Sequence, residues 1–285
     1  MSKKQLHISP HKIKQYTLHL HNEEHAESTV EKYVRDIRAF ADFLDGKAVT
    51  KESAIEWKIR LKETHAASSV NSMLAAINSF FAYFKLDVKV KPYRIQRQTF
   101  LPDKKDLSKN EYERLLKAAN STKNERLFYI MQTICATGIR VSELKFITVE
   151  SVRDGQAVIT NKGKTRTIFI PNELRKSLLH YAKKRSITSG YIFITKSGKP
   201  MSRSNIWAEM KKLCTTAEVE PTKVFPHNLR SLFSRVFYSI DKDLAKLADM
   251  LGHSSVNTTR IYIMESGAKH RRIVENLGLS RLRYM

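Results

Sequence analysis

Long hydrophobic runs and cysteines are scarce in this sequence of 285 residues. No apolar run approaches the roughly 18 residues that a membrane-spanning helix needs, and the N-terminal stretch lacks the apolar core of a signal peptide. We therefore expect a protein of the cytoplasm. The two cysteines, Cys135 and Cys214, lie far apart in apolar surroundings, so we expect reduced core residues and neither a disulfide nor a metal site.

Several catalytic signatures are missing as well. The sequence has no Gly-x-x-x-x-Gly-Lys-Ser/Thr loop, no paired carboxylates and no Cys/His cluster typical of a metal nuclease. Five N-terminal histidines lack the partners of a known metal site, and we expect them to be exposed: His7, His11, His19, His21 and His25. We therefore expect no metal and no nucleotide cofactor.

Acidic residues are too few to balance the basic ones. Lys and Arg number 51 against 28 Asp and Glu, which gives a formal net charge of +23, and no acidic tract offsets it. A charge spread over both halves of the chain can neutralise many phosphates, so nucleic acid is the partner that we expect. The ordinary alternative is a solvated basic surface that aids solubility.

Hydrophobic periodicity predicts a helical N-terminal domain over residues 1–86. A first helix is expected around His11 to His21, and apolar residues then recur every three or four positions in segments 28–44, 51–63 and 68–84. Ser28 and Glu31 have capping-box spacing at the start of the second helix. Residues 87–106 lose the periodicity and hold two prolines, which is typical of an interdomain linker.

Residues 107–285 predict a second domain, mainly helical with a small β-sheet. Ser108 and Glu111 form a second capping-box pattern, which opens a helical stretch reaching about Phe146. From Gly155, two β-branched runs flank the segment Asn161–Lys164, as expected for a hairpin with a basic tip. After this hairpin the helical periodicity returns.

Two basic elements of the second domain are candidates for binding phosphate. Arg140 follows a glycine turn at the point where a helix restarts, and free N–H groups at a helix start favour an anion. Lys162 and Lys164 are held at the hairpin tip, from which an ammonium could reach a groove or a leaving oxygen. Taken separately, such residues are usually ordinary surface groups.

Two further elements add histidines and a tyrosine. His227 and Arg230 are three residues apart, on one face of a helix, and pair an imidazole with a permanently charged fork. His253 follows the end of an apolar helix, and Tyr262 lies nine residues beyond it. Taken alone, His-x-x-Arg is a weak pattern, and Tyr262 between two isoleucines has the ordinary alternative of a buried core residue.

These elements occur in a fixed order: ATGIRVSEL, a hairpin lysine, HNLR, LGHSS and a tyrosine nine residues after the histidine of LGHSS. In this order and spacing the sequence resembles the tyrosine recombinase family, close to its Xer-type members. The resemblance covers the whole second domain, and the first is similar to the family's core-binding domain. It implies a helical core-binding domain followed by an α+β catalytic domain. Carried over to this sequence, it makes the catalytic residues Arg140, Lys162, His227, Arg230, His253 and the nucleophile Tyr262.

The resemblance also assigns supporting residues and shows departures. Glu143 matches the acidic residue that supports the first arginine. Many relatives have Gly-Lys-Gly at the hairpin, but this sequence has Asn161-Lys162-Gly163-Lys164, so Lys164 stays a rival for the lysine role. Ser231 stands where relatives usually have a second histidine, and we expect this difference to be neutral.

The implied reaction is DNA cleavage and rejoining through a 3′-phosphotyrosine, without metal or ATP. The two arginines would clamp the nonbridging phosphate oxygens, because each fork can donate two parallel hydrogen bonds. Tyr262 would attack phosphorus, with His227 the first candidate to take its proton. The resemblance gives protonation of the leaving 5′ oxygen to Lys162 and a phosphate hydrogen bond to His253.

The resemblance implies double-stranded DNA as partner and a homotetramer on two DNA sites, with a dimer on each and a possible accessory recombination protein. A short apolar helix in the C-terminal tail could dock into a neighbouring subunit or fold back on its own domain; its residues are Ile273, Leu277, Leu279 and Leu282. The rival functions are relaxation of DNA by a type IB topoisomerase and noncatalytic DNA binding by a regulator. The target sequence and the biological task, such as mobile-element integration or dimer resolution, stay open.

Overall fold

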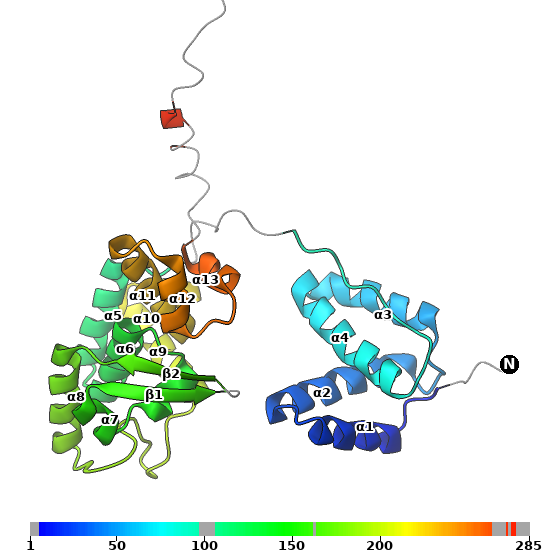
Figure 1. The fold of residues 1–285 in the computed structure, drawn as a ribbon, viewed down its shortest axis with the longest axis horizontal. Coiled ribbons are helices and arrows are strands. Elements are labelled where there is room, and N and C mark those ends of the chain that lie inside the picture. Colours follow the sequence, from blue (N-terminus) through cyan, green and yellow to red (C-terminus); the bar gives the residue numbers. More distant parts are fainter. Residues whose placement is uncertain (1–5, 97–105, 162–163, 264–271, 273–274, 278–285) are drawn as a thin grey trace, which may run out of the picture. The chain divides into compact units, whose positions relative to one another are not determined.

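The computed structural model describes residues 6–96, 106–161, 164–263, 272 and 275–277 (Figure 1). The chain divides into two compact units, residues 1–97 and 98–285. Both units are mainly helical, and the sheet found in the described residues is a two-stranded one in the second unit. The expected fold class is confirmed. In these described ranges, no helix has the length and apolar character to cross a membrane.

The first unit is a bundle of helices with an aromatic core. Its helices are α1 (Pro10–Asn22), α2 (Glu27–Leu44), α3 (Lys51–Thr64) and α4 (Ala67–Tyr83). Their apolar faces meet around Tyr16, Phe40, Trp57, Phe80 and Phe81, all of them buried. The rings of Phe40 and Trp57 are 5.0 Å apart between centroids, close enough to add an aromatic interaction to the area that they bury.

Helix α2 does not use the capping box expected at its start. The helix begins at Glu27, its N-cap is Ala26, and no side chain caps it. The predicted box of Ser28 and Glu31 is therefore wrong. The chain reverses at Glu24, which has a positive φ of 56°, and the Ala26 carbonyl already accepts the first helical bonds, so Ser28 lies inside the first turn.

The segment that follows α4 lies against the first unit as far as Tyr93. Asn78 exchanges two hydrogen bonds with the backbone of Val90, both 2.9 Å, and Asn71 does the same with Tyr93 at 2.9 and 2.7 Å. Val90 is buried. The first residues of the expected linker, 87–93, thus pack on α4, and the domain limits expected from the sequence stay predictions.

The second unit holds the remaining elements. They are α5 (Lys109–Ser121), α6 (Glu125–Thr137), the 3-10 helix η1 (Val141–Phe146), α7 (Val149–Asp154), β1 (Gln156–Asn161), β2 (Lys164–Phe169), α8 (Asn172–Lys184), α9 (Arg203–Lys212), α10 (Cys214–Ala217), the 3-10 helix η2 (Pro221–Lys223), α11 (Pro226–Ile240), α12 (Leu244–Leu251) and α13 (Val256–Ile263). The box of Ser108 and Glu111 caps α5, as predicted: the Ser108 N–H donates to Glu111 at 2.7 Å and the Glu111 N–H to Ser108 at 3.2 Å.

The predicted hairpin is present and antiparallel. Asn161 pairs with Lys164, so the connection consists of residues 162–163, which lie outside the described residues. Ala157, Ile159 and Ile168 point from the strands into the core. Because side chains alternate along a strand, every second residue of β2 faces the same interior.

Packing among the last helices brings distant segments of the second unit together. Helix α11 packs along α6, α13 contacts both α11 and α12, and α12 lies against β2 (Figure 1). The end of α6, the start of α11 and the turn after α12 therefore surround one place. The candidate residues of the sequence come from these segments.

Candidate active site

Arg140 is placed by a sharp chain reversal at the end of α6. Gly138 caps that helix in the left-handed conformation, with φ 67°, and a Cβ there would lie 2.4 Å from the Phe233 ring. Arg140 is then the N-cap of η1. The expected helix start is thus a 3-10 helix. The backbone N–H of Arg140 donates to the Glu143 carboxylate at 2.7 Å, and Arg140 Nη1 donates to the same carboxylate at 2.9 Å.

Glu143 is almost fully buried and is shared by two arginines. Its residue exposure is 1%, and besides Arg140 it accepts two hydrogen bonds from Arg166, at 3.1 and 2.7 Å. Burial alone would raise the pKa of Glu143, but the hydrogen bonds from Arg166 and Arg140 outweigh it and hold that pKa below its usual value. The carboxylate is therefore charged at neutral pH.

Sequence reasoning missed Arg166. The available signal was its position in the hairpin: it pairs with Ile159 and precedes Ile168 by two residues, so it faces the interior with them. An arginine at an inward-facing strand position requires a buried acceptor, because a buried charge without a partner is strongly unfavourable. Glu143 is that acceptor.

Helix α11 carries His227 and Arg230, with Pro226 in its first turn as expected. Arg230 is 2% exposed, and its guanidinium donates to the carbonyls of Gly138 at 2.5 Å and Leu251 at 2.7 Å. Burial and the charge of Arg140 lower the pKa of Arg230 to about 10, and the Tyr262 hydroxyl opposes this shift. Arg230 stays charged at neutral pH and ties the ends of α6 and α12 together.

His253 is neutral, and its tautomer follows from its partners. Arg230 Nη2 lies 2.9 Å from His253 Nε2, and because a guanidinium only donates, Nε2 must accept. The proton is then on Nδ1, which donates to Thr259 Oγ1 at 2.7 Å. Burial, followed by the charges of Arg230, Arg140 and Arg166, lowers the pKa of His253 to about 4, which agrees with the neutral ring.

Tyr262 lies between the two histidines. Its ring centroid is 5.3 Å from that of His227 and 5.7 Å from that of His253, with which it is nearly parallel at 12°. The residue is 7% exposed and also packs with Leu247 and Leu251. Tyr262 is thus a buried residue, as the ordinary alternative expects, but its ring lies beside two imidazoles and near the Arg230 guanidinium.

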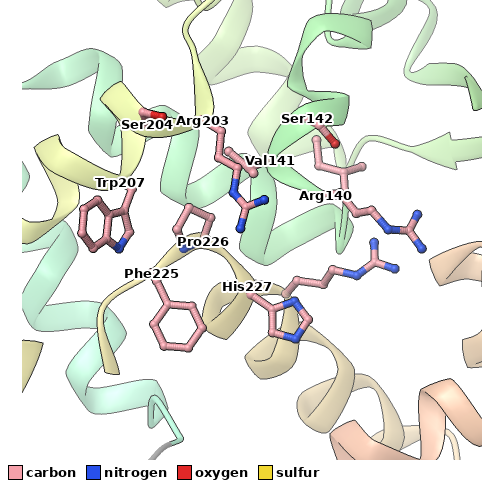
Figure 2. A pocket seen from close by; sticks show the side chains of 11 residues that line it. Arg140, Val141, Ser142, Arg203, Ser204, Trp207, Phe225, Pro226 and His227 are labelled. Atoms are coloured by element: carbon pink, nitrogen blue, oxygen red, sulfur yellow. The ribbon is translucent and has the colours of Figure 1, made fainter. Parts of the chain in front are cut away.

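A pocket of about 440 Å³ opens beside these residues. Figure 2 shows Arg140 and His227 on one side of it and Trp207 and Phe225 on the other, with Arg203 between them. The pocket lining includes no acidic residue. Partial desolvation, followed by the charges of Arg230, Arg203 and Arg140, lowers the pKa of His227, so its imidazole is neutral at pH 7. This pocket suits an anion.

The structure brings together five of the six predicted catalytic residues and the supporting Glu143. Lys162, the sixth, lies outside the described residues, and for Lys164 only the backbone position at the start of β2 is described. In the described part of the chain, no group of three or more His, Cys, Asp or Glu could hold a metal ion. Of the five N-terminal histidines, His19 is half-buried on the Tyr83 ring and the others are exposed.

Comparisons with known proteins identify the fold and the family. Residues 105–268 match the model of the phage integrase family, and residues 13–86 match its N-terminal SAM-like domain. The tyrosine recombinase XerA of Pyrococcus furiosus is 25% identical over 277 residues, which cover 94% of each chain. The tyrosine recombinase XerD of Xanthomonas axonopodis pv. citri is 27% identical over 270 residues, with 84% of this chain and 87% of the relative covered.

Solved structures agree in fold. A lambda integrase dimer bound to a COC' core site matches with a TM-score of 0.74 at 16% identity, over 93% of this chain and 79% of that chain. The XerH site-specific recombinase bound to its difH substrate matches with a TM-score of 0.69 at 17% identity, over 95% and 84%. Since the family model alone covers more than half of its residues, the chain belongs to the phage integrase family and is a tyrosine-type site-specific recombinase related to the Xer enzymes.

Proposed function

We propose that this recombinase cleaves DNA with Tyr262 as nucleophile, forms a 3′-phosphotyrosine and rejoins strands without metal or ATP. The observation that carries the proposal is the position of Tyr262, whose ring lies 5.3 Å from His227 and 5.7 Å from His253. His253 is in turn bonded to the buried Arg230. A phenol, two imidazoles and a guanidinium in one place are what a phosphoryl transfer to tyrosine requires.

Arg140 and Arg230 are the proposed phosphate ligands. A phosphodiester is anionic, so attack on it is favoured by cations that are already in place when charge develops. Both guanidiniums line the pocket, and Glu143 holds Arg140 by two hydrogen bonds while three acceptors hold Arg230. Fixed side chains need little reorganisation to bind the two nonbridging oxygens.

The proton transfers are assigned to the histidines and the hairpin. His227, neutral because its pKa is lowered, is proposed to accept the Tyr262 proton. Lys162 is proposed to protonate the leaving 5′ oxygen, with Lys164 as its rival. His253 is proposed to donate to the phosphate. Because its Nε2 accepts from Arg230 in the free protein, DNA binding must break that contact and place a proton on Nε2, either by protonating the ring or by changing its tautomer.

A nicked suicide substrate containing the recombination site tests the proposal; DNA flanking the gene is the first to try. A covalent protein–DNA band should form without metal or ATP and disappear in Tyr262→Phe. Tyr238→Phe is the matched control: Tyr238 also lies near the end of a helix in the same small cluster, but the ring that lies beside His227 and His253 is that of Tyr262. Loss of the band in both variants, or in neither, would contradict the assignment.

Two rival functions predict different results. A type IB topoisomerase would form the same band and relax a supercoiled plasmid without a specific site, whereas a recombinase exchanges strands between two sites. A noncatalytic regulator would bind the DNA tightly and give no band. The intact set of Arg140, His227, Arg230, His253 and Tyr262 argues against the noncatalytic regulator, and the likeness to Xer recombinases over both units argues against the topoisomerase.

The proposed working form is a homotetramer on two sites of double-stranded DNA, with a dimer on each. It is supported by lambda integrase, which has been solved as a dimer bound to a core site and as a tetramer bound to a Holliday junction. We place the protein at the nucleoid in the cytoplasm, where it acts on chromosomal or mobile-element DNA, with or without an accessory protein. Of the tail residues expected to dock, only Leu277 is described, as exposed; Ile273, Leu279 and Leu282 lie outside the described residues.

A further inference from the structure

Arg166 occupies an unusual position for a charged residue. It lies on the interior side of β2, opposite Ile159, and its side chain is 14% exposed. Both of its terminal nitrogens are used on one carboxylate: Nη1 lies 3.1 Å from Glu143 Oε1 and Nη2 lies 2.7 Å from Oε2. This two-bond geometry fixes the guanidinium in place and cannot be reproduced by lysine.

The carboxylate that Arg166 binds is the one that holds Arg140. Glu143 accepts from the Arg140 N–H and Nη1 as well, so one buried anion lies between two cations. The three side chains together carry one net positive charge. Without Arg166 the remaining pair of Glu143 and Arg140 would have no net charge. The positive charge of Arg140 would then be used to neutralise the buried carboxylate of Glu143.

Arg166 also supports the turn that presents His253. Gly252 ends α12 in the left-handed conformation, with φ 65°, and a Cβ on it would lie 2.6 Å from Arg166 Nη1 and 2.7 Å from its Cδ. The backbone of this turn therefore packs directly on the guanidinium. Arg140 Nη2 reaches the carbonyl of the same Gly252 at 3.4 Å.

We propose that Arg166 is a positioning residue for strand cleavage: through Glu143 and Gly252 it holds Arg140 and the His253 turn, and it leaves the charge of Arg140 free for the scissile phosphate. The inference rests on the proposed roles of Tyr262 and Arg140.

Single-turnover cleavage of the suicide substrate tests this inference in Arg166→Gln and Arg166→Lys. We expect Arg166→Gln to slow cleavage by about 10²–10³-fold, the loss typical of a preorganised charge-stabilising group, with DNA affinity nearly unchanged. Arg166→Lys keeps the charge without the fork and should recover only part of the rate. Thr167→Ala, an exposed neighbour on the same strand, is the matched control and should cleave like the wild type.

Two readouts separate positioning from mere stabilisation. Adding Glu143→Gln to Arg166→Gln restores the net positive charge of the cluster, so the double variant should cleave faster than Arg166→Gln alone. On DNA whose scissile phosphate is replaced by an uncharged methylphosphonate, the deficit of Arg166→Gln should shrink to less than about tenfold, because a neutral group no longer needs the preplaced charge. A loss of equal size on both substrates would overturn the inference.

The remaining outcomes are also distinguishable. If the wild type forms no band through Tyr262, the proposed function fails and Arg166 is not at issue. If the wild type cleaves and both Arg166 variants cleave within about threefold of it, only the role of Arg166 is refuted, since the expected loss is at least about 10²-fold. If Arg166→Gln does not fold, Arg166→Lys decides: a rate equal to the wild type contradicts the requirement for the two-bond geometry.

Discussion

At the scale of single residues, Thr259 holds a catalytic candidate, His253, although it is not itself in the predicted catalytic set. It is fully buried, lies three residues before Tyr262 and accepts a hydrogen bond from His253 Nδ1. It therefore connects the helix that carries the tyrosine with the histidine that contacts Arg230. Arg230 sets the tautomer of His253, and this hydroxyl satisfies the proton that the tautomer leaves on Nδ1.

Thr259→Val keeps the shape of the side chain and removes the acceptor. We expect a loss of about 1–3 kcal/mol in the free energy of unfolding, because the Nδ1 proton is left unsatisfied, together with slower single-turnover cleavage. Urea unfolding and the suicide substrate measure the two effects. Thr259→Ser keeps the hydroxyl and should lose only about 1 kcal/mol, the value of one buried methyl group, with normal cleavage; equal behaviour of the two variants would refute the assignment.

The lowered pKa of His253 predicts a dependence of stability on pH. Its pKa is about 4 in the folded protein, against an ordinary value of 6.5, so the unfolded state binds more protons between these values. The contribution is complete above the unfolded pKa and is lost as pH falls toward 4. Unfolding free energies at pH 7.5 and 5 should therefore differ more in the wild type than in His253→Gln, and an equal difference would count against the neutral, half-buried ring.

The arginines show how far the role of a single residue can be predicted from the sequence. Arg140 and Arg230 belong to short ordered motifs, so their importance can be inferred without coordinates. Arg166 belongs to no such motif: its partner Glu143 is 23 residues earlier, and their contact depends on how the hairpin packs on η1. The neutral state of His253 likewise depends on burial and on the charges of Arg230 and Arg140, which only the folded chain brings to it.

At the scale of elements, the turn between α12 and α13 is the most constrained part of the site. Gly252→Ala should destabilise the protein in two ways: the left-handed backbone costs an L residue about 1–2 kcal/mol, and the new Cβ would collide with Arg166. Gly198→Ala is the matched control, because Gly198 has a similar φ of 76° and no atom within 4 Å.

Gly198→Ala should show only the backbone penalty and cleave normally. Gly252→Ala should lose more stability and also slow cleavage, since displacement of Arg166 disturbs Arg140 and His253 together. Thermal unfolding and the suicide substrate measure both variants. Equal losses in the two would mean that the contact between Gly252 and Arg166 carries no energy.

Helix caps show what the sequence predicts about elements. The box of Ser108 and Glu111 was predicted and is present, because α5 begins at Lys109 and leaves Ser108 as its N-cap. The same spacing at Ser28 and Glu31 failed, because the tight reversal at Glu24 lets α2 begin at Glu27. The reversal is a tertiary feature, and the local pattern does not contain it.

At the scale of the whole molecule, the net charge of +23 predicts how DNA binding responds to salt. If six to ten phosphates are neutralised, affinity for duplex DNA should fall by about 10³–10⁵-fold between about 50 and about 200 mM salt, because condensed counterions are released on binding. Fluorescence anisotropy with a labelled duplex measures this slope. A slope near zero would favour the alternative in which the basic surface only aids solubility.

The central claim is that Tyr262 forms the covalent bond to DNA, and the most direct measurement is to locate that bond. The trapped complex is digested with nuclease and trypsin, and the adduct is mapped by mass spectrometry; Tyr262 lies in the tryptic peptide Ile261–Lys269, which contains no second tyrosine. We predict a 3′-linked nucleotide on Tyr262 in this peptide. An adduct on another residue, or one joined through a 5′-phosphate, would contradict it.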